Sequence, residues 1–210
     1  MDDLQYGAYA DDLEVRVRDG GARLKGSFPY NRRAVLSDGG RRGRPQKEEF
    51  ASRAFSFAVE NREREIHLLV GHSFDRPLAR KLDGSLTLRD TDRALEFEAT
   101  IAAGMRDVSY VRDALAMLSA GLAVGVSPGF RLPPERAVPR DDAEEITEEP
   151  INPEAGEHGA LIRTIRQAIL FEISVVTRPV YEDAQVEARA QQWRAAADSR
   201  QFNHVRRWRP

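Results

Sequence analysis

The chain has 210 residues, of which 41% are hydrophobic, with no cysteine and a formal net charge of -2. A chain of this length can bury one full hydrophobic core, so a single domain is expected. The lack of cysteine excludes thiol nucleophiles, disulfides and thiolate metal sites, which leaves hydroxyl, imidazole and carboxylate groups as candidates for chemistry. No apolar run reaches the roughly 20 residues needed to cross a bilayer, and the acidic start lacks a secretion signal. We therefore expect a soluble, intracellular protein with no membrane partner.

The first predicted elements are strands. Residues Leu13 to Leu24 alternate apolar and charged side chains around Asp-Gly-Gly, a pattern typical of a hairpin. Three further short strands, each bounded by Gly, Asp or Pro, are expected at Glu65 to Val70, Gly84 to Leu88 and Leu95 to Ile101. Together these segments predict an antiparallel sheet.

A helix and a second group of strands follow. Residues Asp107 to Ala120 carry apolar side chains at helical spacing, with Asp107 as the cap and Gly121 as the stop. The sequence "GLAVGVSPGF" predicts a strand that ends in a tight turn, and residues 131–160 predict a flexible, acidic surface loop. The apolar, β-branched run from Ala168 to Val176 predicts a central strand, and Glu182 to Ala197 predicts a final helix.

The predicted organisation is one α+β domain, residues 1–190, followed by a basic C-terminal tail, residues 191–210. Its core is expected to be a mostly antiparallel β-barrel or sheet surrounded by a few helices. Blocks of like charge are usually solvated and mobile, which is the expectation for both the acidic loop and the tail.

Histidine is scarce, so an imidazole mechanism has few candidates. His158 and His204 fall in the segments predicted to be flexible, and His67 lies inside a predicted strand. His72 follows that strand after Gly71, at a strand end where catalytic side chains are often displayed. By itself, however, such a residue is more often an ordinary loop histidine.

Ser127 follows an apolar strand and precedes Pro128 and Gly129, which would turn the chain sharply. Glycine at that point lets backbone N–H groups converge, as an oxyanion hole requires. Glu172 is a carboxylate within an apolar strand and therefore needs a buried partner, either a histidine or one of several nearby arginines. A plain turn serine and a structural ion pair are the ordinary interpretations of these two residues.

Three separated blocks of the chain resemble, in order and spacing, the prohead or capsid-maturation proteases of tailed phages. They are "IHLLVGHSFDRPLARKLDGSLTLRDTDRALEFEATI", "LSAGLAVGVSPGF" and "RTIRQAILFEISVVTRPVYEDAQV". In that family a histidine follows a strand, a serine precedes a Gly-Phe pair, and an acidic residue lies in the late strand before "SVV". The resemblance implies His72 as base, Ser127 as nucleophile and Glu172 as third member, with Asp75 and Asp90 as rivals for the last role.

The resemblance also implies a fold like that of the herpesvirus assemblins and a serine endopeptidase that needs no cofactor or metal. It implies cleavage of the major capsid protein and its scaffold segment, and of the protease itself, inside the immature head in the host cytoplasm. A homodimer or larger assembly is expected. Pro128 departs from the family pattern and removes one backbone N–H from the turn that should hold the oxyanion, with Gly129 or a neighbouring strand as the remaining donor.

Two other classes stay open. The first is an inactive assembly or scaffolding factor that keeps the protease fold, which Pro128 favours. The second is a nucleic-acid-binding module, for which the arginine-rich tail is the only support, so nucleic acid is not the expected partner. The tail from Asp198 to Pro210 is also a candidate packaging tether or self-cleavage product.

Overall fold

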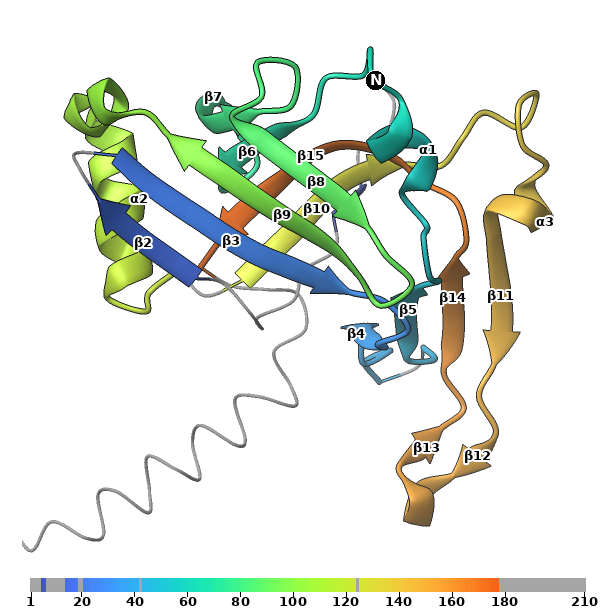
Figure 1. Cartoon of the computed structure of the whole chain (residues 1–210). Coiled ribbons are helices and arrows are strands. Elements are labelled where there is room, and N and C mark those ends of the chain that lie inside the picture. The colour runs from blue at the N-terminus through green and yellow to red at the C-terminus, as the bar shows by residue number, and fades with distance from the viewer. Residues whose placement is uncertain (1–4, 7–13, 19–20, 42, 124, 178–210) are drawn as a thin grey trace, which may run out of the picture.

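Strands dominate the computed structural model, which describes residues 5–6, 14–18, 21–41, 43–123 and 125–177. Within these ranges the chain forms fifteen strands, three α-helices and two 3-10 helices. The strands group into one five-stranded sheet, two four-stranded sheets and one two-stranded hairpin (Figure 1). This architecture is compatible with the predicted α+β class, but none of the described sheets closes into a barrel.

Two of the predicted catalytic residues, Ser127 and Glu172, lie in strands of the five-stranded sheet, and His72 lies in a connection between two of its strands. In spatial order its strands are β1 (Gln5–Tyr6), β10 (Gly125–Arg131), β15 (Ile169–Val176), β6 (His67–Val70) and β7 (Ser73–Arg80). The prediction of a central strand in the late apolar run is confirmed, because β15 is the third of the five. It runs antiparallel to β10 and parallel to β6, so the sheet is mixed rather than purely antiparallel.

The second sheet is fully antiparallel and lies across the first (Figure 1). Its strands in spatial order are β2 (Glu14–Arg18), β3 (Gly21–Pro29), β9 (Ala94–Ile101) and β8 (Leu86–Asp90). The predicted hairpin is confirmed, because Arg18 pairs with Gly21 across β2 and β3. Burial alternates along β9, with Glu96 and Glu98 less buried than their neighbours, as expected for a strand with one face on the core.

The hydrophobic core lies between these two sheets. Its fully buried members come from both of them, including Leu24, Phe28 and Leu95 from one sheet and Phe130 and Ile173 from the other. Phe130 also contacts a cluster of aromatic rings, most of whose pairs are edge-to-face, which consists of Phe28, Tyr30, Phe50 and Phe55. Such ring pairs add about 0.5–1.5 kcal/mol each beyond their buried area.

Helices cover the ends of this core. The predicted amphipathic helix is confirmed as α2 (Ser109–Ser119), which follows the 3-10 helix η1 (Ala103–Asp107) at one end of the two sheets (Figure 1). Val108 rather than Asp107 is its N-cap, and Gly121, with φ of 67°, ends it as predicted. The short helix α1 (Ser56–Glu60) precedes β6.

The third sheet extends from the other end of the molecule (Figure 1). Its strands in spatial order are β11 (Glu144–Glu148), β14 (Leu161–Ile165), β5 (Gln46–Phe50) and β4 (Ala34–Ser37). Beyond β11 and β14 the chain forms the small hairpin of β12 (Ile151–Asn152) and β13 (Glu157–His158), which η2 (Pro153–Ala155) connects. The helix α3 (Arg140–Ala143) leads into β11.

The prediction that residues 131–160 form an irregular loop is therefore wrong. Its block of acidic side chains was expected to be solvated and mobile, but cations from elsewhere in the chain pair with several of them. The described pairs join Glu148 to Arg44 at 3.0 Å, Glu149 to Lys47 at 2.7 Å and Glu145 to Arg166 at 2.5 Å. Once these charges are paired, the backbone of β11 forms a regular ladder with β14. The predicted helix at Glu182–Ala197 and the basic tail lie outside the described residues.

Candidate active site

His72 sits at the tip of the tight connection between β6 and β7. Gly71 and His72 both have φ of 60°, a left-handed conformation that is uncommon for a residue with a side chain. Two hydrogen bonds fix this connection to the end of β15: the N–H of Gly71 donates to the carbonyl of Val175 at 3.0 Å, and the N–H of His72 donates to Ser174 Oγ at 2.9 Å. The end of β15 therefore holds the backbone of this connection, from which the imidazole projects.

Glu172 is the carboxylate that contacts this imidazole. It lies in β15 with no exposed surface, and its Oε1 is 2.7 Å from His72 Nδ1. Its Oε2 accepts a hydrogen bond from Ser174 Oγ at 2.7 Å. Successive side chains on a strand alternate between faces, so Glu172 and Ser174, two residues apart, share one face of the sheet. The structure thus supplies the partner that was expected for the buried Glu172, a histidine whose side chain is 22% exposed.

The two rival carboxylates lie elsewhere. Asp75 is exposed on β7. Asp90 ends β8 in the second sheet, where the hydroxyl of Tyr30 donates to its Oδ1 at 2.5 Å. Burial raises the pKa of the Asp90 carboxyl above its usual range, and burial together with the neighbouring charge of Asp90 raises the pKa of the Tyr30 hydroxyl. Asp90 thus belongs to a structural pair with Tyr30.

Ser127 reaches the same face from the neighbouring strand. In the antiparallel ladder of β10 and β15 it is directly opposite Ser174, so the two side chains project from the sheet side by side. Ser127 is 1% exposed, and its Oγ is buried with no hydrogen-bond partner among the described residues. The structure therefore brings Ser127, His72 and Glu172 to one patch, with the His72–Glu172 contact formed and the hydroxyl not hydrogen-bonded to the imidazole.

The prediction of a tight turn at Pro128 and Gly129 is wrong, because both residues lie inside β10. Gly129 pairs with Glu172 on one side and with Tyr6 on the other, and N–H groups in such a ladder lie in the plane of the sheet. The oxyanion role predicted for Gly129 has no support in that geometry. Its absent side chain matters instead: a Cβ on Gly129 would lie 2.1 Å from Glu172 Oε1. The Glu172 carboxylate occupies the space that a Cβ at position 129 would need.

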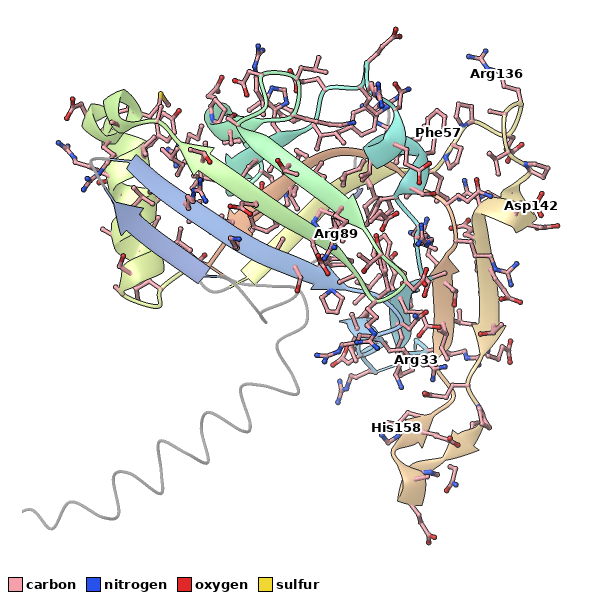
Figure 2. All side chains as sticks on the ribbon, viewed as in Figure 1. Arg33, Phe57, Arg89, Arg136, Asp142 and His158 are labelled. Atoms are coloured by element: carbon pink, nitrogen blue, oxygen red, sulfur yellow. The ribbon has the colours of Figure 1, made fainter. Side chains whose placement is uncertain are left out.

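The remaining histidines have other surroundings. The His67 ring packs edge-to-face against Phe74, with the centroids 5.9 Å apart. His158 lies on the outer hairpin of β12 and β13, far from the β6–β7 connection (Figure 2).

Ser174 is a functional candidate that the sequence alone did not single out. The available indication was a polar residue two positions after Glu172 in an otherwise apolar strand, which places both on one face.

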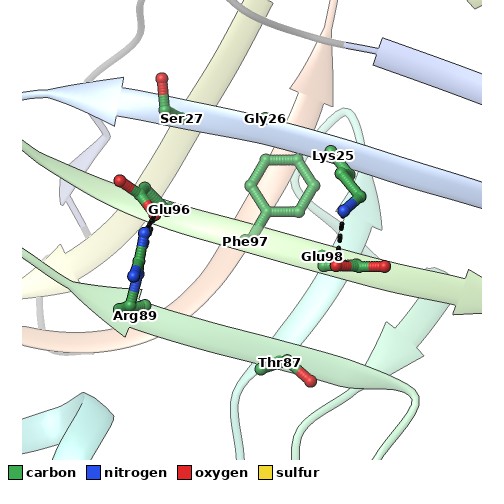
Figure 3. Close-up of a pocket in the computed structure, with 8 residues that line it drawn as sticks. All are labelled: Lys25, Gly26, Ser27, Thr87, Arg89, Glu96, Phe97 and Glu98. Atoms are coloured by element: carbon green, nitrogen blue, oxygen red, sulfur yellow. Dashed lines mark hydrogen bonds and ion pairs between the residues drawn. The ribbon is translucent and has the colours of Figure 1, made fainter.

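Two hollows differ in their relation to this site. One, on the surface of β3, β8 and β9, carries charges that pair with each other, Lys25 with Glu98 at 2.8 Å and Arg89 with Glu96 at 2.5 Å (Figure 3). The other, a cavity of about 360 Å³, borders the His72 connection. Its lining is mostly apolar and is formed by Val70, Gly71, Ser73, Arg76, Ala114, Met117, Ala123, Val175, Val176 and Thr177.

The described residues contain no group of three or more His, Asp or Glu side chains that could hold a metal ion. Every helix in the same ranges is too short or too polar to cross a membrane. The site contains an alcohol, an imidazole and a buried carboxylate at one patch of the five-stranded sheet. That is the set of groups with which serine hydrolases work.

A family model described as caudovirus prohead serine protease matches residues 40–199, which include all three of these residues. The chain belongs to this family, whose members are classed as serine peptidases. Neither the curated proteins nor the solved structures contain a match. The predicted likeness to the herpesvirus assemblins thus stays a prediction.

Proposed function

We propose that the chain is a serine endopeptidase in which Ser127 is the nucleophile, His72 the general base and Glu172 the residue that orients His72. The observation that carries this proposal is the 2.7 Å contact between His72 Nδ1 and Glu172 Oε1, next to the strand position of Ser127. A carboxylate accepts at Nδ1 only if that nitrogen carries the proton, so the lone pair of the neutral ring lies at Nε2. The proposal therefore assigns Nε2 as the nitrogen that takes the proton of Ser127.

The proposed reaction follows from these roles. His72 Nε2 takes the proton of Ser127 Oγ as the oxygen attacks the scissile carbonyl, and returns that proton to the leaving amine as the C–N bond breaks. Water then hydrolyses the acyl-enzyme with His72 again as the base. Glu172 stabilises the imidazolium that forms in each step. The apolar cavity beside the His72 connection is suited to one side chain of an extended peptide.

Membership of the prohead protease family supports a biological setting for this activity. We propose that the substrates are the major capsid protein with its scaffold segment and the protease's own chain, during maturation of the phage head. The same proposal places the protein in the immature head within the host cytoplasm, as a homodimer or larger assembly.

The test is covalent labelling by a fluorophosphonate, which reacts preferentially with an activated serine oxygen and loses fluoride. We expect the full-length protein to be labelled at Ser127, identified by mass spectrometry of the modified peptide. Ser127→Ala and His72→Ala should each abolish labelling, because loss of either group of a triad costs on the order of a millionfold in turnover. Ser119→Ala, which changes an exposed serine at the end of α2, is the matched control and should label normally. Labelling that survives Ser127→Ala would reject the assignment.

One observation favours a second candidate, an assembly factor that keeps the protease fold without activity. Ser127 Oγ is buried without a hydrogen bond, and Pro128 supplies no N–H beside it. This candidate predicts no labelling of the wild-type protein, even when the capsid protein is co-expressed with it. Cleavage of the capsid band that stops in the Ser127→Ala variant would exclude it.

A further inference from the structure

We infer that Ser174 is a positioning residue of the site, whose hydroxyl holds the Glu172 carboxylate and the His72 backbone in their working arrangement. This inference rests on the proposed function, because it assigns a role relative to the same three residues. It concerns a residue that touches both Glu172 and His72 without itself contacting the atoms that react.

The contacts of Ser174 are specific. The residue has no exposed surface, and its Oγ donates to Glu172 Oε2 at 2.7 Å while accepting from the His72 N–H at 2.9 Å. A serine hydroxyl has one proton to donate, and here the carboxylate takes it. One buried oxygen atom therefore connects two of the three groups that the mechanism needs.

The bond to Oε2 decides how the carboxylate is turned. The last torsion of a glutamate side chain is broad, so a single contact at Oε1 leaves the carboxylate free to rotate. With Oε2 held by Ser174 and Oε1 facing His72 Nδ1, both oxygens are fixed and the plane of the carboxylate is determined. This raises the fraction of molecules in which His72 Nδ1 has its carboxylate acceptor.

The bond from the His72 N–H acts on the backbone. His72 adopts φ of 60°, which costs energy for a residue with a side chain and persists only where the surroundings hold it. The Ser174 hydroxyl and the Val175 carbonyl are the two acceptors on β15 that hold this connection. Ser174 thus sets where the imidazole stands as well as how its carboxylate partner is turned.

The same contacts distinguish Ser174 from the serine directly opposite it. The proton of the Ser174 hydroxyl is engaged by a carboxylate, whereas Ser127 Oγ has no partner in the structure described. A nucleophile must be able to give its proton to the base as it attacks. Of these two neighbouring serines, Ser127 suits the nucleophile and Ser174 suits the support.

The experiment measures fluorophosphonate inactivation of the full-length protein and of its Ser174→Ala and Ser174→Thr variants. We expect Ser174→Ala to lower the inactivation rate constant about 10- to 100-fold with unchanged reagent affinity, the size of effect that a misplacement of about 1 Å produces. Ser174→Thr keeps the hydroxyl and should recover most of the rate. If Ser174→Ala does not fold, Ser174→Cys fills similar space with a weak donor and takes its place.

A second measurement does not depend on activity. The proton on His72 Nδ1 gives a ring N–H resonance in 15N-histidine-labelled protein, here recorded in a Ser127→Ala background. Ser174→Ala should shift that resonance or broaden it by exchange with water, at temperatures where the fold is intact, and Ser174→Thr should restore it. A purely structural role of Ser174 would lower the unfolding temperature and leave this resonance unchanged.

The outcomes separate the two proposals. If Ser127→Ala abolishes labelling while Ser174→Ala keeps the wild-type rate and the His72 resonance, the role of Ser174 is refuted and the proposed function stands. If labelling persists in Ser127→Ala, the proposed function itself fails, whatever Ser174 does.

Discussion

The space beside Gly129 is filled by the Glu172 side chain, which makes Gly129→Ala a severe change. The added Cβ would lie 2.1 Å from Glu172 Oε1, 2.8 Å from its Cδ and 3.0 Å from its Cγ. An ordinary C···O contact is about 3.3 Å, so the oxygen must move by about 1.2 Å or the strands must separate. Glu172 is fully buried and held at both oxygens, which leaves no low-energy way for it to yield.

The magnitude follows from what that movement breaks. Oε1 is the atom that contacts His72 Nδ1, and a hydrogen bond to a charged group contributes about 1.5–3 kcal/mol. Forcing an extra carbon into a packed interior costs a further 1–3 kcal/mol or so. We expect Gly129→Ala to lower the free energy of unfolding by about 2.5 to 6 kcal/mol and to reduce fluorophosphonate labelling at least about 100-fold.

The assay is urea denaturation followed by circular dichroism, with labelling kinetics on the protein that remains folded. Gly104→Ala is the matched control, because a Cβ at Gly104 meets no atom within 4 Å and its φ is not positive. It should change the free energy of unfolding by no more than about 0.5 kcal/mol. If Gly129→Ala unfolded at the same urea concentration as the control and labelled at the wild-type rate, the reasoning about Glu172 and Gly129 would be refuted.

Two further predictions concern partly or fully buried carboxylates, and each is tested by the pH dependence of the free energy of unfolding. Tyr30→Phe removes the donor to Asp90, and because Asp90 is only partly buried we expect a loss of about 1–2 kcal/mol in the free energy of unfolding at pH 7. Burial already raises the pKa of Asp90, so the contribution of Asp90 to the free energy of unfolding falls as pH rises from the ordinary carboxyl range through that raised pKa. Tyr30→Phe removes a hydrogen bond that lowers this pKa, so the free energy of unfolding of the variant should fall further over this range and differ less from that of the wild type at pH 4. Adding Asp90→Asn to the variant should remove this pH dependence. An equal loss at both pH values in urea denaturation would contradict this prediction. Arg163→Met leaves Glu48 and Glu144, which are 3% and 8% exposed, without the cation that contacts both, and should cost about 3–5 kcal/mol at pH 7. Burial raises the pKa of Glu48 and Arg163 opposes that rise, so calorimetry should show the loss shrinking toward pH 4 as the carboxyl binds its proton; a loss under about 1 kcal/mol at pH 7 would show that other groups neutralise the pair.

Local patterns were sufficient where a segment's structure depends on its own side chains. The hairpin of β2 and β3, the helix α2 and the strand β15 follow from alternation, helical spacing and an apolar run, and the structure confirms all three. The strands β3 and β15 and the helix α2 bury side chains that their own sequence pattern defines, so neighbouring elements affect where each one lies more than whether it is a strand or a helix.

Local patterns failed where the deciding partner is distant in the chain. The acidic segment looked like a solvated loop because no Arg or Lys lies within its acidic stretch from Asp141 to Gly159, yet Arg44 and Lys47 neutralise it from about one hundred positions away. Likewise, Pro-Gly after Ser127 resembles a turn, but pairing with β15 keeps these residues in a strand. The glycine is needed there for the carboxylate of a residue in the adjacent strand.

The sequence by itself determined which residue types could act here: a serine, a histidine that follows a strand, and a carboxylate in an apolar strand that needs a partner. Only the tertiary structure decided that the carboxylate meeting His72 is Glu172 rather than an aspartate, that Gly129 makes room for it, and that Ser174 turns it. The physical reason is the register between strands. A side chain's chemistry and its face are set along the chain, but which side chain lies opposite it depends on ladders formed between β6, β15 and β10, segments that the sequence keeps far apart.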